Sequence, residues 1–252
     1  MHIDLTGTNI LITGASRGIG RAMARAMGEA GARVGLHGHR NMESAQSLAN
    51  ELGNGARAFQ ADLADVDATE CLFDEVFHAF GRIHVLVNNA GIALQMPLDT
   101  PTQAWHEAWQ KTMAVNLRAV EQLCRRAIGH FRRNAGGRII NVASRAAFRG
   151  DEPDYMAYAA SKGGVVALTR SIARGYGKDG ICAFVLAPGY VRTDMAQDFI
   201  DVYGEAHAVS DLALDHLTEP ADLAPIAVLL ASGLADHATG CTIDLNAGSY
   251  VH

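Results

Sequence analysis

The sequence predicts a single domain of the α/β class, in which helices cover both faces of a doubly wound, mostly parallel seven-stranded sheet. Seven short runs rich in β-branched and other apolar residues alternate with longer stretches whose apolar residues recur at helical spacing. Several of the short runs are apolar on successive residues, which is typical of parallel strands buried on both faces. This alternation continues without a linker through all 252 residues, so we expect one domain over residues 1–252.

The expected strands and helices follow one another in regular order. Strands are expected at Asn9–Thr13, Arg33–His37, Arg57–Gln60, Ile83–Val87, Arg138–Val142, Ile181–Leu186 and Thr242–Leu245. Helices are expected at Arg21–Ala30, Met42–Leu52, Asp67–Phe80, Thr102–Arg133, Tyr158–Tyr176 and Ala221–Ala231. The segment 193–220 has the weakest pattern, and we expect either a mobile lid beside a substrate site or two short surface helices.

Composition and charge exclude several classes of protein. Hydrophobic residues make up 49% and charged residues 19%, which suits a buried core and does not suit a disordered chain. The net charge of −6 without a basic block argues against nucleic-acid and anionic-membrane partners. No apolar run approaches the roughly 18 residues of a membrane span. Four widely spaced cysteines without a secretory signal predict reduced thiols and a cytoplasmic location.

A glycine-rich turn follows the first expected strand and opens directly onto a helix. Its sequence is Thr13-Gly14-Ala15-Ser16-Arg17-Gly18-Ile19-Gly20. Glycines at such a turn let the backbone approach a pyrophosphate, and the helix N-terminus adds unpaired N–H groups and partial positive charge. The turn therefore indicates a dinucleotide site, with glycines packed only for steric reasons as the alternative.

A second candidate site lies far away in the sequence, at the head of a long expected helix. Tyr158 and Lys162 are four residues apart, so their side chains emerge on one helix face. A phenol has a pKa near 10, and a nearby ammonium favours its ionised form, which makes proton exchange with a substrate oxygen feasible. Two surface neighbours without a function are the alternative. Tyr155 has Ala159 as its fourth successor and therefore has no such partner.

These motifs, with several others, resemble the short-chain dehydrogenase/reductase family in its compact subtype. The motifs are Thr13–Gly20, Asn88-Asn-Ala-Gly91, Asn116, Ser144, Tyr158-x-x-x-Lys162, Pro188-Gly189 and Thr239–Gly248. They occur in the order of the family and span nearly the whole chain. The resemblance implies a Rossmann fold, a nicotinamide cofactor and an oxidoreductase that interconverts a carbonyl and a secondary alcohol. It also implies a homotetramer joined through the long helices and the last strand.

The resemblance assigns catalytic roles to four residues. Ser144 would hydrogen-bond the substrate oxygen, and Tyr158 would exchange a proton with it as general acid/base. Lys162 would hold the nicotinamide ribose and lower the pKa of Tyr158, while Asn116 would anchor a water that links Lys162 to solvent. Fourteen positions separate Ser144 from Tyr158, slightly more than the family pattern, which puts the shape of this loop in question.

The resemblance also implies a cofactor site spread over the strand ends. Gly14, Gly18 and Gly20 would line the pyrophosphate, and Asp62 would meet the adenine amine. Asn88, Ala90 and Gly91 would flank the adenosine ribose, and Val191 and Thr193 would fix the carboxamide. For Asn88 and Asn116 the alternative is hydrogen bonding to nearby backbone, and for Asp62 it is a helix cap. The expected set is Gly14, Ser16, Arg17, Gly18, Ile19, Gly20, Arg40, Asp62, Leu63, Asn88, Ala90, Gly91, Tyr158, Lys162, Pro188, Gly189, Val191 and Thr193.

The residues after the second expected strand bear on the choice of cofactor. NAD-preferring relatives place an acidic residue where this chain has Gly38. Arg40 and Arg17 are candidate guanidinium donors to a 2′-phosphate, whose charge near −2 an aspartate would repel. We therefore expect NADP(H), with NAD(H) as the alternative. The alternative for Arg17 and Arg40 is that they are solvated surface residues without a role in binding. His37 and His39 lack a third ligand, so we expect no metal.

The substrate stays open between two classes. Gln95, Arg145, Asp154 and Tyr190 lie in segments expected to border it, and such polar side chains suit a sugar-like alcohol or hydroxylated ketone. Many compact members of the family instead reduce 3-oxoacyl chains on the acidic acyl carrier protein. A cluster at Arg125, Arg126, Arg132 and Arg133 would suit that carrier, but Asp179 stands where the family has a basic residue.

A non-catalytic, nucleotide-sensing protein is the alternative from another class. A sensor would have no need to keep all four catalytic residues, so their presence favours an enzyme that acts on a small-molecule substrate.

Overall fold

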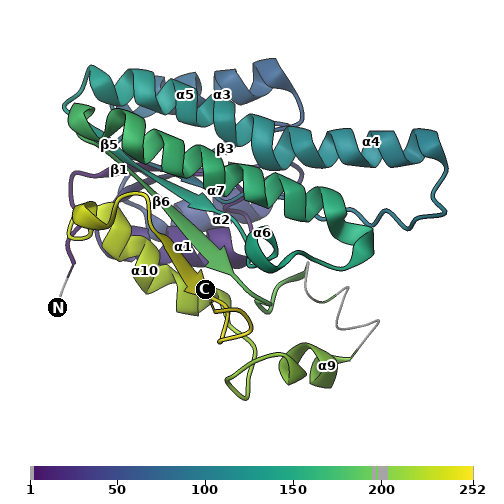
Figure 1. The fold of residues 1–252 in the computed structure, drawn as a ribbon. Coiled ribbons are helices and arrows are strands. Elements are labelled where there is room, and N and C mark those ends of the chain that lie inside the picture. The colour runs from purple at the N-terminus through teal and green to yellow at the C-terminus, as the bar shows by residue number, and fades with distance from the viewer. Residues whose placement is uncertain (1–2, 195–196, 198–203, 252) are drawn as a thin grey trace.

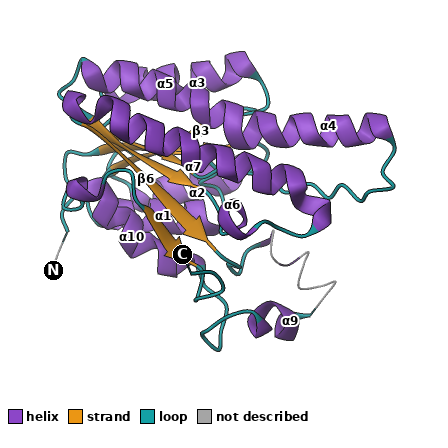
Figure 2. Ribbon diagram, viewed as in Figure 1, coloured by secondary structure: helices purple, strands orange, loops and turns teal. Residues whose placement is uncertain are grey.

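All seven strands join one parallel sheet in the order β3-β2-β1-β4-β5-β6-β7 (Figures 1 and 2). The structure is a computed structural model that describes residues 3–194, 197 and 204–251. The strands are β1 Asn9–Ile12, β2 Arg33–Gly38, β3 Arg57–Gln60, β4 Val85–Asn88, β5 Gly137–Val142, β6 Ile181–Pro188 and β7 Thr242–Leu245. The expected doubly wound α/β fold is confirmed, with only small shifts of strand ends.

The helices lie between successive strands, as expected for parallel connections. The longer ones are α1 Gly18–Glu29, α2 Met42–Leu52, α3 Val66–Phe80, α4 Thr102–Met113, α5 Ala119–Arg132, α7 Met156–Tyr176 and α10 Pro220–Ser232. The shorter ones are α6 Ala146–Arg149, α9 Glu205–Ser210, the π turn η1 Ala114–Arg118, and the 3₁₀ turns η2 Pro153–Tyr155, η3 Gly177–Asp179 and η4 Asp236–Ala238. The sequence did not predict α6 or the 3₁₀ turns, because segments this short carry no periodicity.

The apolar core has two layers because each strand buries both of its faces. In β1, Ile10 and Ile12 pack with α1, α2 and α10 on one face, whereas Leu11 packs with α3, α5 and α7 on the other. Figure 1 shows these two helix layers on opposite sides of the sheet. All three side chains are fully buried, which is why the strand is apolar on successive residues.

The helix starts differ in a way that matters for the site. Asn41 caps α2 by accepting from the Ser44 N–H at 3.3 Å, and Asp65 caps α3 by accepting from the Ala68 N–H at 2.9 Å. Arg17 precedes α1 without making a side-chain cap. The first N–H groups of α1 are therefore available to an anionic ligand.

The long helix expected at Thr102–Arg133 contains a π turn. Helix α4 continues through η1 into α5, and the Ala119 N–H donates to the carbonyl of Ala114, five residues earlier. A π turn inserts one extra residue into a helix, and such turns occur frequently at functional sites. This one contains Asn116.

Part of the weakly patterned segment 193–220 lies outside the described residues, namely 195–196 and 198–203. Its described part contains the short helix α9 and a parallel bridge between Val191 and Thr218. Within the described ranges, no helix is both long and apolar enough to cross a membrane.

Candidate active site

The candidate site lies at the carboxyl edge of the sheet, where the strand order reverses between β1 and β4. A ligand crevice is expected at this switch point of a doubly wound sheet. The turn after β1 contacts the turn after β4, since a Cβ on Gly14 would lie 2.9 Å from the Ala90 Cα. A Cβ on Gly18 would lie 3.2 Å from Thr193 Cγ2, in the segment after β6. Three segments of the expected cofactor site therefore meet here.

The glycine-rich turn has a shape that side chains would disrupt. Gly14 and Gly18 have φ of 65° and 51°, in the left-handed region that favours glycine. At Gly20 a Cβ would lie 2.2 Å from the Gly14 carbonyl oxygen, which no real contact allows. The turn also leads into the uncapped start of α1. Close backbone packing and free N–H groups fit a bound pyrophosphate.

Thr13 and Asn89 hold the two central turns together. The Thr13 hydroxyl accepts from the N–H groups of Asn89 at 2.9 Å and Ala90 at 3.0 Å. Asn89 Nδ2 donates to the carbonyls of Thr13 at 2.9 Å and Gly14 at 3.2 Å. Asn89 is not among the expected site residues, although it belongs to the motif Asn88-Asn-Ala-Gly91.

The expectation that Asn88 flanks the adenosine needs correction. Its side chain is 2% exposed and donates to Asn141 Oδ1 at 2.8 Å and to Cys124 Sγ at 3.4 Å. These partners lie on β5 and α5, between the sheet and a helix layer. The Asn88 side chain therefore stabilises the interior through two other side chains, and neither the crevice nor the backbone groups named as the alternative are its partners.

Tyr158 and Ser144 form the hydroxyl pair of the site. Tyr158 is on the first turn of α7, and Ser144 follows β5 with its Oγ accepting from the Ala146 N–H at 3.1 Å. Burial raises the pKa of Tyr158 to about 12, against the lowering effect of its hydrogen bond with Ser144, while the charge of Asp151 raises it further. The phenol is therefore protonated at neutral pH.

Lys162 lies below Tyr158 on the same helix face, as its spacing predicts. The ammonium is 5.7 Å from the centre of the Tyr158 ring and donates to the Val142 carbonyl at 2.8 Å. Burial lowers the pKa of Lys162 to about 8. In this arrangement the pKa of Tyr158 is raised, because burial of the phenol dominates, and the expected lowering by Lys162 stays a prediction.

Asn116 joins the π turn to the loop after β4. Its side chain is fully buried, its Oδ1 accepts from the Ile92 N–H at 2.8 Å, and its Nδ2 donates to the Ile92 carbonyl at 2.8 Å. Nδ2 also lies 3.1 Å from the Ser161 hydroxyl. A Cβ on Gly91 would lie 3.4 Å from both Asn116 Oδ1 and Lys162 Nζ, so these three residues meet. The water expected beside Asn116 stays a prediction.

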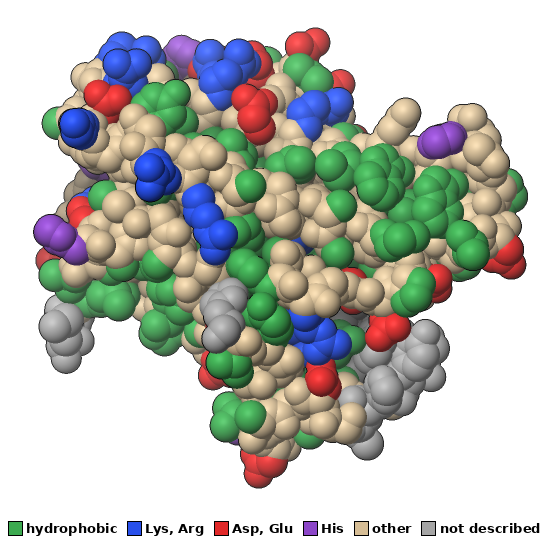
Figure 3. Space-filling model, viewed as in Figure 1, with side chains coloured by type: hydrophobic (Ala, Val, Ile, Leu, Met, Phe, Trp, Pro, Cys, Tyr) green, Lys and Arg blue, Asp and Glu red, His purple; other side chains and the backbone are tan. Residues whose placement is uncertain are grey.

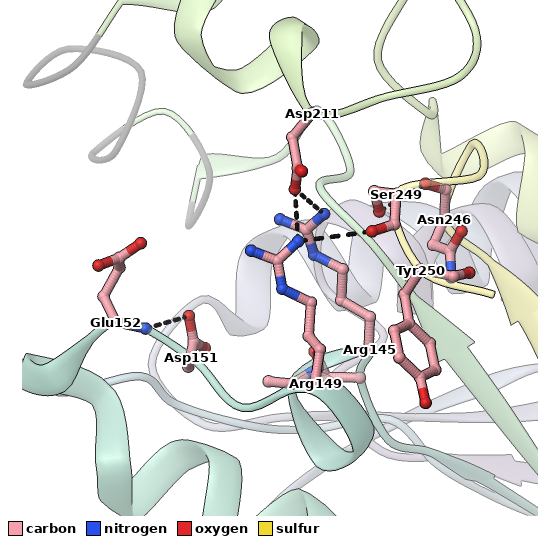
Figure 4. Close-up of polar contacts among 10 residues, drawn as sticks. Arg145, Arg149, Asp151, Glu152, Asp211, Asn246, Ser249 and Tyr250 are labelled. Carbon is pink, nitrogen blue, oxygen red and sulfur yellow. Dashed lines mark hydrogen bonds and ion pairs between the residues drawn. The ribbon is translucent and has the colours of Figure 1, made fainter. Parts of the chain in front are cut away.

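Arg145 and Tyr190 meet on the side of the crevice expected to hold substrate. The guanidinium carbon of Arg145 lies 4.4 Å from the centre of the Tyr190 ring, and its Nη1 lies 2.9 Å from Asp211 Oδ2. Arg149 binds the same carboxylate, as Figure 4 shows. Both arginines point toward the segment that leads out of α9, so the loop after Ser144 is linked to this segment.

The other two expected substrate residues lie in neighbouring loops. The Asp154 carbonyl accepts from the Met96 N–H at 2.8 Å, which joins the η2 turn to the loop that carries Gln95. Gln95 is exposed, and Asp154 is half-buried. Asp151 and Glu152 lie on the same connection, and in Figure 4 both are set apart from the arginine pair.

Residues expected near the adenosine lie at the ends of β2 and β3. Arg40 is exposed, whereas the guanidinium of Arg17 is 2.7 Å from Asp194, an ion pair across the mouth of the crevice. Asp62 accepts from the Ala64 N–H at 2.9 Å and lies 3.8 Å from His39. Leu63 is 6% exposed and belongs to the core, so its side chain is not a crevice side chain.

The remaining expected cofactor residues surround the same crevice. A Cβ on Gly189 would lie 2.8 Å from the Asn246 Cα, so the turn after β6 packs tightly against the end of β7. Val191 is buried, and its carbonyl accepts from the Thr193 hydroxyl at 3.2 Å. Ser16 and Ile19 are half-buried in the glycine turn, and Pro188 ends β6.

Comparisons with known proteins identify the family of the chain. A family model described as short chain dehydrogenase matches residues 8–203. A curated relative, 3beta-hydroxysteroid dehydrogenase 1 of Eggerthella lenta, is 36% identical over 98% of this chain and 95% of its own length.

Two solved structures are similar over nearly their full lengths. A blue fluorescent protein from a metagenomic library, in complex with NADPH, is 34% identical with a TM-score of 0.91, covering 98% of this chain and 100% of that one. A 3-ketoacyl-(acyl-carrier-protein) reductase from Brucella melitensis, complexed with NADH, is 30% identical with a TM-score of 0.89 and the same coverage.

Proposed function

Because the chain belongs to the short-chain dehydrogenase family, we propose that it interconverts a carbonyl group and a secondary alcohol, with NADP(H) as the preferred cofactor. The observation that carries this proposal is the meeting of Ser144, Tyr158 and Lys162 beside the glycine-rich turn. Ser144 is close enough to Tyr158 to lower its pKa, and Lys162 lies one turn along the same helix face. This arrangement supports a proton donor next to a site that fits a dinucleotide.

The described residues fit a nicotinamide dinucleotide. The turn at Gly14, Gly18 and Gly20 and the free start of α1 would hold the pyrophosphate, and Lys162 would hold the nicotinamide ribose. Thr193, which faces Gly18, would meet the carboxamide. The bound cofactor supplies or accepts the hydride.

The proton in the proposed reaction comes from Tyr158. In carbonyl reduction Ser144 donates a hydrogen bond to the substrate oxygen, and the Tyr158 phenol transfers its proton to the same oxygen. The Tyr158 phenol is protonated at neutral pH, so it holds the proton that carbonyl reduction needs. For alcohol oxidation the same group must first lose its proton, so oxidation should be favoured by high pH.

The preference for NADP(H) rests on charge at the end of β2. Gly38 supplies no carboxylate to repel a 2′-phosphate, and Arg40 is exposed close by. Arg17 is a second candidate donor if it exchanges Asp194 for phosphate. The two similar structures hold NADPH and NADH respectively. A kcat/KM ratio of NADPH over NADH near or below unity would contradict the preference.

Charge also bears on the class of substrate. The arginines on α5 are already paired, Arg125 with Glu70 and Arg126 with Asp74, while Arg132 lies 3.2 Å from Asp179. An acidic carrier protein therefore meets a neutralised surface there. Near Tyr158, the connection after Ser144 carries three carboxyl groups, at Asp151, Glu152 and Asp154. Carboxylates accept hydrogen bonds from hydroxyl groups, which favours a small hydroxylated ketone or sugar-like alcohol.

The decisive experiment compares wild type with Tyr158→Phe on a panel containing a sugar-like ketone, an aromatic ketone and a 3-oxoacyl thioester. We expect NADPH consumption with at least one ketone, and loss of turnover in Tyr158→Phe with NADPH binding retained. The matched control is Tyr155→Phe, three residues earlier and half-buried, which should keep wild-type activity. Unchanged turnover in Tyr158→Phe would remove the proton-donor assignment.

A nucleotide sensor without turnover is the second candidate function. The same panel separates the two, because a sensor binds NADPH tightly and consumes none with any ketone. The proximity of Ser144 and Tyr158, with Lys162 on the same helix face, favours the enzyme.

The homotetramer and the cytoplasmic location stay predictions. On α7, Val165, Val166 and Ile172 pack into the core, whereas Leu168 is half-buried. Leu168 lines a surface groove with Trp109 and other residues of α4 and η1, and Figure 3 shows apolar side chains gathered over these helices. A second copy of the chain would cover this face, and light scattering in solution tests the tetramer.

A further inference from the structure

His37 lies between two of the segments proposed to hold the cofactor. It is in β2 and 2% exposed. The Gly14 N–H donates to His37 Nδ1 at 3.1 Å, and His37 Nε2 lies 3.1 Å from the Ala61 carbonyl oxygen. The backbone is joined as well, because the Ala15 N–H donates to the His37 carbonyl at 2.8 Å. The ring thus connects the turn after β1 with the end of β3.

These contacts define the protonation state of the ring. A nitrogen that accepts from an N–H group carries no proton, so the proton is on Nε2, which donates to Ala61. Burial lowers the pKa of His37 to about 4, so the ring is neutral at physiological pH. Both ring nitrogens are used, one as an acceptor and one as a donor.

The two backbone groups bound by His37 are placed where the cofactor would be held. Gly14 is the first glycine of the turn and has a positive φ, and Ala61 directly precedes Asp62 and Leu63. An apolar side chain such as the neighbouring Leu36 would fill the space but would leave the Gly14 N–H and the Ala61 carbonyl without this partner. Filling the interior therefore does not explain a histidine here.

We propose that His37 is a positioning residue for the dinucleotide. Its neutral ring fixes the Gly14 turn, which would hold the pyrophosphate, relative to the end of β3, which would border the adenine. This proposal rests on the proposed function and adds a residue to it. His37 acts through the backbone of Gly14 and Ala61, so it affects how tightly the cofactor binds and leaves the proton chemistry at Tyr158 unchanged.

The test uses three substitutions that separate hydrogen bonding from volume. In His37→Asn the amide oxygen takes the place of Nδ1 and still accepts from Gly14, although Ala61 is lost. His37→Gln can reach Ala61 but has no acceptor at the Nδ1 position, and His37→Leu keeps volume alone. We expect the dissociation constant and the KM for NADPH to rise about tenfold in His37→Leu, from loss of a buried partner. The rise should be smaller in His37→Asn than in His37→Gln.

The kcat at saturating NADPH should stay within about twofold of wild type in all three variants, since Tyr158, Ser144 and Lys162 are untouched. The matched control is His130→Leu. His130 is also buried, and its Nε2 accepts from the Ile83 N–H at 3.1 Å, at the opposite edge of the sheet. His130→Leu should lower the melting temperature as His37→Leu does, and should leave the KM for NADPH unchanged.

Three results would overturn the proposal. One is an unchanged NADPH affinity in His37→Leu. Another is tighter NADPH binding by His37→Leu than by His37→Asn, which would mean that volume alone matters. If His37→Leu does not fold, equal affinities of His37→Asn and His37→Gln have the same meaning. Wild-type protein that binds neither NADPH nor NADH would instead remove the proposed function, so the two failures are distinguishable.

Discussion

At both edges of the sheet, histidine side chains accept hydrogen bonds from backbone N–H groups, but these bonds position different groups. At the amino edge, the Asn9 N–H donates to His84 Nδ1 at 2.9 Å and the Ile83 N–H donates to His130 Nε2 at 3.1 Å. At the carboxyl edge, His37 accepts from the Gly14 N–H in the same way. The amino edge is closed by such side chains, whereas the carboxyl edge has glycines where side chains would fill the crevice.

Because the same hydrogen bond occurs at both edges, the bond itself does not mark a functional residue. What differs is the group that the bond positions. At the amino edge the bound N–H groups belong to Asn9, which opens β1, and to Ile83, two residues before β4, so their loss should reduce stability alone. At the carboxyl edge the bound groups belong to turns around the crevice, so their loss should also change how a ligand is held.

The largest expected effect is that of Gly20→Ala at the carboxyl edge. The new methyl would lie 2.2 Å from the Gly14 carbonyl oxygen and 2.4 Å from Asn89 Nδ2, so the turn must move. We expect NADPH affinity to fall at least about a hundredfold and stability to fall by about 3 kcal/mol. Calorimetric titration and thermal unfolding measure the two quantities.

The matched control is Gly175→Ala, near the end of α7, where a Cβ meets nothing within 4 Å. This change should leave NADPH affinity unchanged and raise stability by about 0.5–1 kcal/mol, as expected for alanine in an exposed helix. Equal NADPH affinity in both glycine variants would contradict the assignment of the turn.

The next largest effect is expected for Asn116→Ala. This change removes three hydrogen bonds of a fully buried amide and leaves both backbone groups of Ile92 without that partner. We expect a loss of about 2 kcal/mol in the free energy of unfolding and a clear fall in kcat. The comparison at the amino edge is Asn134→Ala, which removes a 2.8 Å bond to the His130 carbonyl. The kcat of Asn134→Ala should match that of wild type. A fall in kcat as large as that of Asn116→Ala would contradict the contrast between the two edges.

A smaller effect is expected for Arg40→Glu, which brings a carboxylate near the proposed 2′-phosphate. The kcat/KM ratio of NADPH over NADH should fall about tenfold or more, because like charges repel. Arg57→Glu is the control, since Arg57 is exposed at the start of the neighbouring strand β3. It should leave the ratio unchanged. A ratio that does not respond to Arg40→Glu would assign the phosphate to other residues.

The smallest effect is expected from pH. Burial lowers the pKa of His37 to about 4, the hydrogen bond with Ala61 and the charge of Asp62 oppose this, and His39 lowers it further. Burial also lowers the pKa of His84 and His130. The folded state therefore binds fewer protons than the unfolded state between about pH 6.5 and 4. Stability should be fully present above 6.5 and should fall as pH decreases through this window.

For His37 alone, the loss should be about 1 kcal/mol between pH 6.5 and 5.5. Chemical denaturation at a series of pH values measures it. The His37→Leu variant should lose this part of the slope and His130→Leu should retain it, and the reverse result would contradict the assignment.

Periodicity predicted the sheet and its covering helices because burial on both faces leaves a direct trace in the sequence. The spacing of Tyr158 and Lys162 also predicted that they share one helix face, since it matches a helical turn. It did not predict the π turn, because one extra residue within 31 helical positions hardly disturbs the apolar pattern. It also did not predict the raised pKa of Tyr158, which depends on burial by segments far away in sequence.

The motif Asn88-Asn-Ala-Gly91 shows a second limit. Successive residues at the end of a strand point in opposite directions, so one asparagine enters the interior and the next reaches the glycine turn. The motif alone does not say which is which. His37 shows a third limit, because its partners Gly14 and Ala61 lie 23 and 24 positions away and only the sheet order brings them together.

The π turn at Ala114–Arg118 has a consequence for how this helix tolerates length changes. One residue of an α-helix turns the chain by about 100°, so an inserted residue rotates everything beyond it relative to everything before it. Deleting Val115 would let α4 run into α5 as an unbroken α-helix. The face of α5 that packs on the sheet would then be out of phase with the side chains of α4. The rotational phase of this long helix is thus set by one extra residue, in the turn that contains Asn116.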